Sequence, residues 1–511
     1  MSDSRTKNTA RTMAAGLLNR LVMILFPFVN RTIIIYLLGA EYAGLSGLFQ
    51  AILSVLSLAE LGFNSAIVYS MYRPAAEGDT QQICRLLTLY RKLYMLVGSV
   101  ILLGGLALVP FLPYLIQGDI PPDVSLYGLY FLYLADTVVS YFLFAYRESL
   151  LLAHQRRDIS HMIATGVILL QYVAQAAVLL LWRNFYWYLM VTIVCTVVKN
   201  CAVALATRKR YPEYHCVPGV RVRLSDSMKK MVRALLIGNI CDQARNSFDN
   251  IILSAYLGLM AVTIYSNYYL IYSSLYGIML TVCTSMASSV GNSIATESVE
   301  KNYGDLRKFS FLAAWLSGWF AICMLCLYQP FMELWVGRTL MLTDGNMMLL
   351  CIYFYAINMN NVRNQYINGN GLWDRLKLTF AVEAAANIGL NLILGKLWGI
   401  TGIILATILT IFFSNFLWRT WILFKTYFRE MSLGRYLREH LYWALCVALT
   451  GGITWLVCSR IHLGTFAQLI VNGCICVVLP NVLLLLLFFR TEQFRAASSF
   501  VKQHLGRLGR A

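Results

Sequence analysis

The chain is dominated by about fourteen long apolar segments that follow one another with only short loops between them. Each segment approaches the ~20 residues that a helix needs to cross a bilayer. With 59% hydrophobic and 13% charged residues, water could not solvate the chain. The sequence therefore predicts an all-α polytopic membrane protein. The segments lie near residues 17–38, 42–70, 93–116, 125–147, 160–182, 185–207, 234–257, 262–290, 309–331, 346–368, 378–396, 400–424, 441–459 and 466–489.

The Lys and Arg residues fall on alternate sides of these segments. If the N-terminus is cytoplasmic, the cytoplasmic regions hold 33 of the 42 Lys and Arg residues, whereas the outer loops hold four. This asymmetry satisfies the positive-inside rule, and one missed helix would destroy it. We expect both termini to lie in the cytoplasm, with the protein in the plasma membrane of a bacterium. The net charge of +18 then indicates contact with anionic lipid headgroups rather than with nucleic acid.

An internal repeat predicts two similar halves. Shifting the sequence by 219 residues lays Ile33–Gly39 over Ile252–Gly258, so the first and seventh helices correspond. Repeats of this kind commonly enclose a binding site between the halves, near the membrane midplane. The expected parts are an N-terminal six-helix bundle at 1–210, a basic cytoplasmic linker at 211–233, a C-terminal six-helix bundle at 234–424, and a terminal helix pair with a cytoplasmic tail at 425–511.

Polar side chains form stripes on several predicted helices. On the seventh helix they recur at offsets of three and four, which places them on one helical face. Comparable stripes on the tenth and eleventh helices, and polar positions on the second, indicate a wet cavity that both halves line. Hydrogen bonds that only join neighbouring helices are the alternative explanation. The predicted lining residues are Asn239, Asp242, Asn246, Asp249, Asn250, Asn358, Asn361, Asn364, Asn387, Gln50 and Glu60.

Five basic residues lie at membrane depth, namely Arg31, Arg245, Arg363, Lys199 and Arg419. A cation at the bilayer centre costs at least ~2.5 kcal/mol on insertion scales, so each should face water or a partner. We expect the first four to line the cavity and bind an anionic substrate, because guanidinium groups can grip two phosphate oxygens. Local ion pairs and snorkelling are the alternatives. For Arg419, near the inner end of its helix, we expect snorkelling.

Three carboxylates at membrane depth, Asp242, Glu383 and Asp136, are candidates for coupling transport to protons or sodium ions. No pattern predicts a metal, a cofactor or a catalytic residue. Cys323 and Cys326 form a C-x-x-C motif inside a predicted membrane helix, where a small buried apolar side chain is the usual explanation. The one run that resembles a phosphate-binding loop has the wrong spacing. We therefore expect a protein that is not an enzyme and holds no cofactor.

Several motifs together resemble a known family. They are Asn30–Thr32, Leu56–Gly62 and Tyr69–Pro74 in the first half, and Asp249–Ile252 and Gly291–Ala295 in the second. On these motifs the chain resembles the bacterial polysaccharide flippases, which belong to the multidrug/oligosaccharidyl-lipid/polysaccharide exporter (MOP) superfamily. The resemblance covers essentially the whole chain.

The resemblance implies two helical bundles around a cationic cavity that opens alternately to the two sides of the membrane. The cargo would be an oligosaccharide carried on a polyprenyl diphosphate, with its anionic headgroup bound by Arg31, Arg245 and Arg363. Membrane lipids, a polysaccharide polymerase and glycosyltransferases are the partners considered, and we expect a monomer. Three alternatives stay open: a multidrug or cation antiporter of the same superfamily, a peptidoglycan-precursor flippase and, from another class, a membrane glycan polymerase or ligase.

Overall fold

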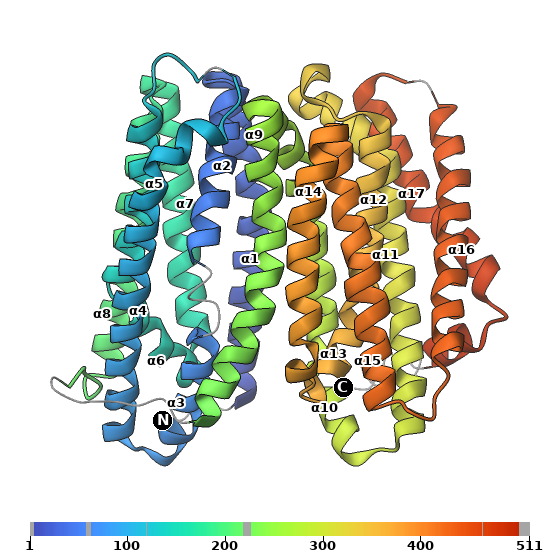
Figure 1. Ribbon diagram of the computed structural model, residues 1–511, viewed down its shortest axis with the longest axis horizontal. Coiled ribbons are helices and arrows are strands. Elements are labelled where there is room, and N and C mark those ends of the chain that lie inside the picture. The colour runs from blue at the N-terminus through green and yellow to red at the C-terminus, as the bar shows by residue number, and fades with distance from the viewer. Residues whose placement is uncertain (1–4, 58–62, 119, 218–225, 462, 500–511) are drawn as a thin grey trace. The chain divides into compact units, whose positions relative to one another are not determined.

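The computed structural model describes residues 5–57, 63–118, 120–217, 226–461 and 463–499, with the backbone alone for 5–15, 17–18, 63–66, 69 and 226–246. Within these residues every regular element is a helix (Figure 1). The predicted all-α, multi-pass fold is therefore confirmed. By its internal contacts the chain divides into two compact units, Met1–Thr263 and Ile264–Ala511. The four-part division expected from the sequence stays a prediction.

The N-terminal unit is built from long helices joined by short connections. Helix α1 packs along α7, and α8 packs against α5 and α7. Side-chain caps define several helix starts: Asp79 accepts from the backbone N–H of Gln82, and Asn184 accepts from that of Tyr186. The elements are α1 (Arg5–Leu37), α2 (Ala40–Leu56), α3 (Phe63–Glu77), α4 (Thr80–Leu108), η2 (Val109–Leu115), α5 (Leu126–Phe142), η3 (Ala145–Arg147), α6 (Glu148–Ala153), α7 (Arg157–Trp182), α8 (Phe185–Arg210) and the first part of α9 (Asp226–Ser285).

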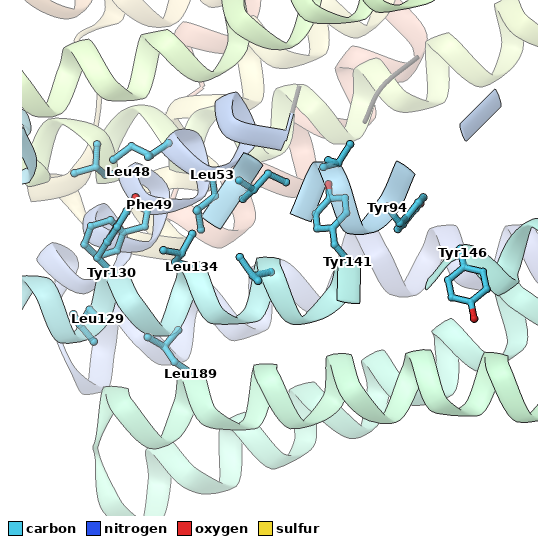
Figure 2. Packing of buried hydrophobic residues seen from close by; sticks show 14 of the residues in the cluster. Leu48, Phe49, Leu53, Tyr94, Leu129, Tyr130, Leu134, Tyr141, Tyr146 and Leu189 are labelled. Carbon is cyan, nitrogen blue, oxygen red and sulfur yellow. The ribbon is translucent and has the colours of Figure 1, made fainter. Parts of the chain in front are cut away.

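A core of aliphatic and aromatic side chains holds this unit together (Figure 2). Phe49 of α2 is fully buried and lies edge-on to Tyr130 of α5, with 5.7 Å between the ring centroids. The Tyr130 hydroxyl donates to the Gly105 carbonyl of α4 at 2.9 Å. Tyr130 therefore keeps its hydroxyl satisfied inside an apolar contact, as a buried tyrosine requires.

The C-terminal unit is organised around α11, which packs against α12, α16 and α17. The two terminal helices thus belong to the same compact unit as the helices that precede them. The elements are the second part of α9, α10 (Ala287–Thr296), α11 (Val299–Val336), η4 (Arg338–Leu340), α12 (Asp344–Asn358), α13 (Asn361–Gly369), α14 (Trp373–Thr410), the π-helix η5 (Ile411–Trp418), α15 (Arg419–Thr426), α16 (Leu433–Ser459) and α17 (Thr465–Phe488).

Two glycines interrupt a helix within a single residue. Gly258 in α9 has φ 80° and ψ 179°, and Gly399 in α14 has φ 58° and ψ −132°. These angles are accessible to glycine and strained for a residue with a Cβ atom. Gly39, after α1, also has a positive φ of 128°, and it is the residue that the 219-residue shift lays over Gly258. The matching positions of the predicted repeat therefore share a backbone break.

These breaks account for the number of crossings. In the described part of the chain, nine helices are long and apolar enough to span a membrane, or ten if α5 and the bent segment after it form one span. Two of the nine, Ser247–Thr296 and Trp373–Thr426, are 50 and 54 residues long and contain the glycine breaks, so each is long enough to cross twice. Adding α5 with the bent segment after it as one span, α2 with α3 as a second and α12 with α13 as a third gives fourteen, the number that the sequence predicts.

Candidate functional site

The sequence-predicted residues of the seventh and second helices are only partly described. Arg245, Asn239, Asp242 and Asn246 lie in the part of α9 of which only the backbone is described, and Glu60 lies outside the described residues. Asp249 is buried in α9, Asn250 is half-buried beside it, and Gln50 of α2 is exposed. The cavity role of these residues stays a prediction.

Arg31 lies in the interior of the N-terminal unit. It is half-buried on α1, one turn after Pro27, and its guanidinium donates to the backbone carbonyl of Thr263 at 3.3 Å. The hydroxyls of Tyr133 on α5 and Tyr188 on α8 lie within electrostatic range of it. The adjacent Asn30 amide donates to the Tyr188 hydroxyl at 2.6 Å. Arg31 is therefore surrounded by polar groups from three other helical segments.

Two opposite charges, those of Asp136 and Lys199, adjoin the surroundings of Arg31. Asp136, one turn after Tyr133 on α5, accepts a hydrogen bond of 2.7 Å from the Thr196 hydroxyl on α8. Lys199, half-buried one turn after Thr196, lies close enough to Asp136 for the two charges to attract each other. We call Asn30, Arg31, Tyr133, Asp136, Tyr188, Thr196 and Lys199 the N-terminal polar cluster.

The N-terminal polar cluster brings together three residues predicted separately. Arg31, Lys199 and Asp136 carry two positive charges and one negative charge, so the cluster favours an anion over a cation as a ligand. The sequence prediction missed the tyrosines. A signal for Tyr188 was present in the sequence, because Tyr188 belongs to a polar stripe on α8 that continues through Thr192, Thr196 and Lys199 at helical spacing.

Arg363 has a different environment in the C-terminal unit. It lies on α13 and is completely buried. Its Nη1 donates to the backbone carbonyls of Asn415 at 2.6 Å and Phe416 at 3.2 Å, and its Nη2 donates to the Asn415 side chain at 2.7 Å. The acceptors lie in the π-helix η5, where i→i+5 pairing replaces the α-helical pattern. In this conformation the Arg363 guanidinium is fully buried and offers no surface to a ligand.

Glu383 and Arg419 form a buried ion pair across the two segments that meet at Gly399. Each side chain is only 4% exposed. Arg419 also donates to the Thr379 hydroxyl at 3.2 Å and lies over the Phe380 ring, 3.8 Å from its centroid. The prediction that Arg419 snorkels is therefore wrong, because a buried carboxylate at the same depth lets the cation stay inside the protein.

The asparagines of the tenth and eleventh helices make hydrogen bonds inside the C-terminal unit. The Asn361 side-chain amide donates to Oδ1 of Asn358 at 2.9 Å, and Oδ1 of Asn364 accepts from Arg363 at 2.8 Å. The Asn387 side-chain amide donates to the Thr407 hydroxyl at 3.2 Å, which joins the two segments of α14. The first two contacts are local in the sequence, whereas the third has the form of the interhelical alternative considered for the stripes.

Comparison with known proteins identifies the fold. A scan against protein-family models finds no match, and a search of curated proteins finds no relative in sequence. The lipid II flippase MurJ, in an inward closed conformation, is similar at a TM-score of 0.68 and 14% identity, over 93% of this chain and 98% of that one. A mutant of the Vibrio cholerae MATE transporter VcmN is similar at a TM-score of 0.57 and 15% identity, over 84% and 99% of the two chains.

A third similar structure is an inward-facing multidrug resistance MATE transporter of the MOP superfamily, with a TM-score of 0.58 and 14% identity over 80% of this chain and 99% of that one. Identities this low establish a common fold and nothing finer. The chain therefore has the fold of MOP-superfamily transporters.

Proposed function

We propose that this protein is a flippase that moves a polyprenyl-diphosphate-linked oligosaccharide from the cytoplasmic to the outer leaflet, for the synthesis of a cell-surface polysaccharide. It would work by alternating access along a cationic pathway and would make or break no covalent bond. The N-terminal polar cluster is the observation that carries the proposal, because it holds Arg31 and Lys199 among hydroxyl groups at membrane depth.

The chemistry of the cargo fits this cluster. Sugar hydroxyls and diphosphate charges cannot cross hydrocarbon unaided, since each unpaired polar group costs several kcal/mol to desolvate. Arg31 and Lys199 would offset the phosphate charge, and Tyr133 and Tyr188 offer hydroxyl groups for hydrogen bonds to the headgroup or sugar. Arg245 is proposed for the same role from its place in the sequence. The lipid tail would stay in the bilayer.

The membrane potential would drive the negatively charged cargo in one direction. With the positive-inside orientation predicted above, an inside-negative potential favours outward movement by ~2.3 kcal/mol per negative charge per 100 mV. Asp136 would then hold Lys199 in place when no substrate is bound. Coupling to protons or sodium ions through Asp136 or Asp242 is the competing arrangement.

A lipid II flippase is a second candidate. The similarity to MurJ extends over 93% of this chain, whereas the MATE similarities quoted above reach 84% and 80%. Both flippase functions involve a lipid-linked, phosphorylated sugar, and they differ in the sugar that is accepted. A cation antiporter is less compatible with the N-terminal polar cluster, in which positive charges outnumber the single carboxylate.

The decisive experiment is transport by the purified protein in liposomes. A fluorescent polyprenyl-diphosphate oligosaccharide is placed in both leaflets, and a membrane-impermeant quencher reports how quickly the protected pool becomes accessible. Arg31→Ala should slow exchange by about 10- to 100-fold, because a charge-assisted hydrogen bond is worth about 1.5–3 kcal/mol. Arg31→Lys should retain part of the activity.

Arg338→Ala is the matched control, since Arg338 is exposed and pairs with Glu333 at 2.7 Å at the end of α11. Unchanged exchange in Arg31→Ala would refute the assigned role of Arg31. Preference for lipid II over oligosaccharides would favour the second candidate, and transport of organic cations without lipid exchange would favour an antiporter. Longer glycans after the assay, detected by mass spectrometry, would indicate a polymerase.

A further inference from the structure

Cysteines from three helices of the C-terminal unit converge on one point. The sulfur atoms of Cys326 on α11, Cys458 on α16 and Cys476 on α17 all lie within 4.8 Å of one another. Cys323, one turn before Cys326, adjoins them, with its sulfur 3.9 Å from the Cys476 carbonyl oxygen. We call Cys326, Cys458 and Cys476 the thiol triad.

The thiol triad lies in an apolar interior. Its three residues are 5%, 3% and 1% exposed, and Trp443, Val447 and Leu484 belong to the same buried cluster. A single buried cysteine is usually a small apolar side chain. That explanation does not account for three sulfurs that meet from three different helices, one of which, α11, lies more than a hundred residues before the other two along the chain.

The spacing suits a metal ion. Three sulfurs at the corners of a triangle with 4.8 Å sides lie about 2.8 Å from its centre, and metal–thiolate bonds are ~2.3 Å long. Each sulfur would therefore move by about 0.5 Å or less to close on an ion, which a small rotation about χ1 within the same rotamer can provide. The free thiols of the described residues are available for such a contact without the breaking of any disulfide.

We propose that the thiol triad is a binding site for a monovalent thiophilic ion, copper(I), with Cys323 as an adjoining fourth sulfur. Soft sulfur ligands select copper(I), and a low-dielectric interior disfavours net charge. Copper(I) bound by one thiolate and two neutral thiols is a neutral complex. Binding forms copper–sulfur bonds and releases one thiol proton to water, with no change in oxidation state. A divalent zinc ion would need two thiolates for the same neutrality.

A groove in the same unit has one lining residue in contact with the site. The groove has a volume of about 910 Å³, and its lining includes Trp315, Trp319 and Asn481. The Trp319 indole N–H donates to the Cys476 carbonyl at 2.8 Å, and Cys323 follows Trp319 by one helical turn. Under this proposal, copper(I) passed from a soluble thiol or thioether carrier would reach the thiol triad past Trp319.

The experiment uses the full-length reduced protein in detergent without oxygen. Copper(I) is added in competition with the chromophoric chelator bicinchoninate, and X-ray absorption reports the coordinating atoms. We expect about one copper(I) per chain with a first shell of sulfur alone. Cys326→Ala with Cys476→Ala should lose this copper, with an affinity reduced by more than the ~10–100-fold that loss of an outer-shell partner costs. Cys446→Ala should bind as the wild type does, because Cys446 is buried on α16 outside the triad.

Failure of the wild-type protein to compete for copper(I) would overturn the proposal, as would a first shell that contains nitrogen or oxygen. Zinc held more tightly than copper(I) would overturn the choice of a monovalent ion. A folded double variant that still binds copper would exclude the triad as the site. If the double variant does not fold, the coordination shell of the wild-type protein decides the question. Lipid exchange is not used as a readout, so the outcome is independent of the proposed flippase function.

Discussion

Neutralising Glu383 gives a direct test of what this carboxylate does. The sequence suggests an ion-coupling site, whereas the structure places Glu383 in a buried ion pair with Arg419. Glu383→Gln keeps the size of the side chain and an acceptor oxygen but removes the charge. If the ion pair is structural, the variant should lose stability whether or not the protein is transporting substrate.

The expected loss in the free energy of unfolding depends on the contacts that Arg419 keeps. Removing one partner of a buried ion pair costs about 3–5 kcal/mol. In Glu383→Gln the guanidinium keeps its hydrogen bond to Thr379 and its position over the Phe380 ring, a cation–π contact worth ~2 kcal/mol when desolvated. We therefore expect a loss near the lower limit, about 3 kcal/mol. Arg419→Ala removes these contacts as well and should cost about 5 kcal/mol.

Equilibrium unfolding in mixed micelles, titrated with sodium dodecyl sulfate, measures these free energies. The double variant Glu383→Leu with Arg419→Met should return to within about 1–2 kcal/mol of the wild type, because apolar residues of similar volume can replace a buried pair. If Glu383→Gln unfolds like the wild type but no longer transports, the structural explanation is wrong and the ion-coupling role is supported.

Three further predictions concern packing and buried polar contacts. Gly44→Ala should destabilise the protein by about 1–3 kcal/mol in a thermal melt, since its Cβ would lie 2.4 Å from the Leu259 carbonyl oxygen, and a melt like that of the wild type would contradict this close contact. Arg363→Met should cost about 1–3 kcal/mol in unfolding titrations because buried carbonyls of η5 lose their donor, whereas a stabilised variant would show that those carbonyls find other partners. Arg307→Gln should lower the midpoint of thermal unfolding by a few degrees, equivalent to about 1–3 kcal/mol, since Arg307 donates to the Glu439 carboxylate at 2.9 Å. An equal shift of the unfolding midpoint in Arg338→Ala, which breaks an exposed ion pair, would argue against a stabilising role for the Arg307–Glu439 pair.

The fold was largely predictable because it depends on properties that need no knowledge of tertiary contacts. The length of apolar runs and the placement of Lys and Arg define fourteen crossings, since the bilayer imposes a minimum helix length and an orientation. The glycines at 39 and 258 were visible as matching positions of a repeat, and the structure gives both a positive φ. The break at Gly399 was equally readable, as a gap of three residues between an apolar helix ending near 396 and another beginning near 400.

The side-chain partners were less predictable because they depend on helix rotation as well as depth. Glu383 lies 16 residues before Gly399 and Arg419 lies 20 residues after it, so a hairpin at Gly399 brings them to similar depth. Whether the two side chains face each other depends on the number of residues per turn in the helices between them, and this number changes in the π-helix. The thiol triad shows the same difficulty, because Cys458 and Cys476 lie far from the C-x-x-C motif in the chain and no local spacing connects them.

The α-helical stretch 400–410, between Gly399 and the π-helix at Ile411–Trp418, also constrains how the chain length can change. Each α-helical residue advances the direction of the following side chains by about 100°. Deletion of a single residue in this stretch would therefore rotate every later side chain of the helix by roughly that angle, taking Arg419 away from Glu383 while the apolar composition stays almost the same. A deletion that barely changes the mean hydropathy would thus separate a buried cation from its anion, so the number of residues in this stretch should stay fixed.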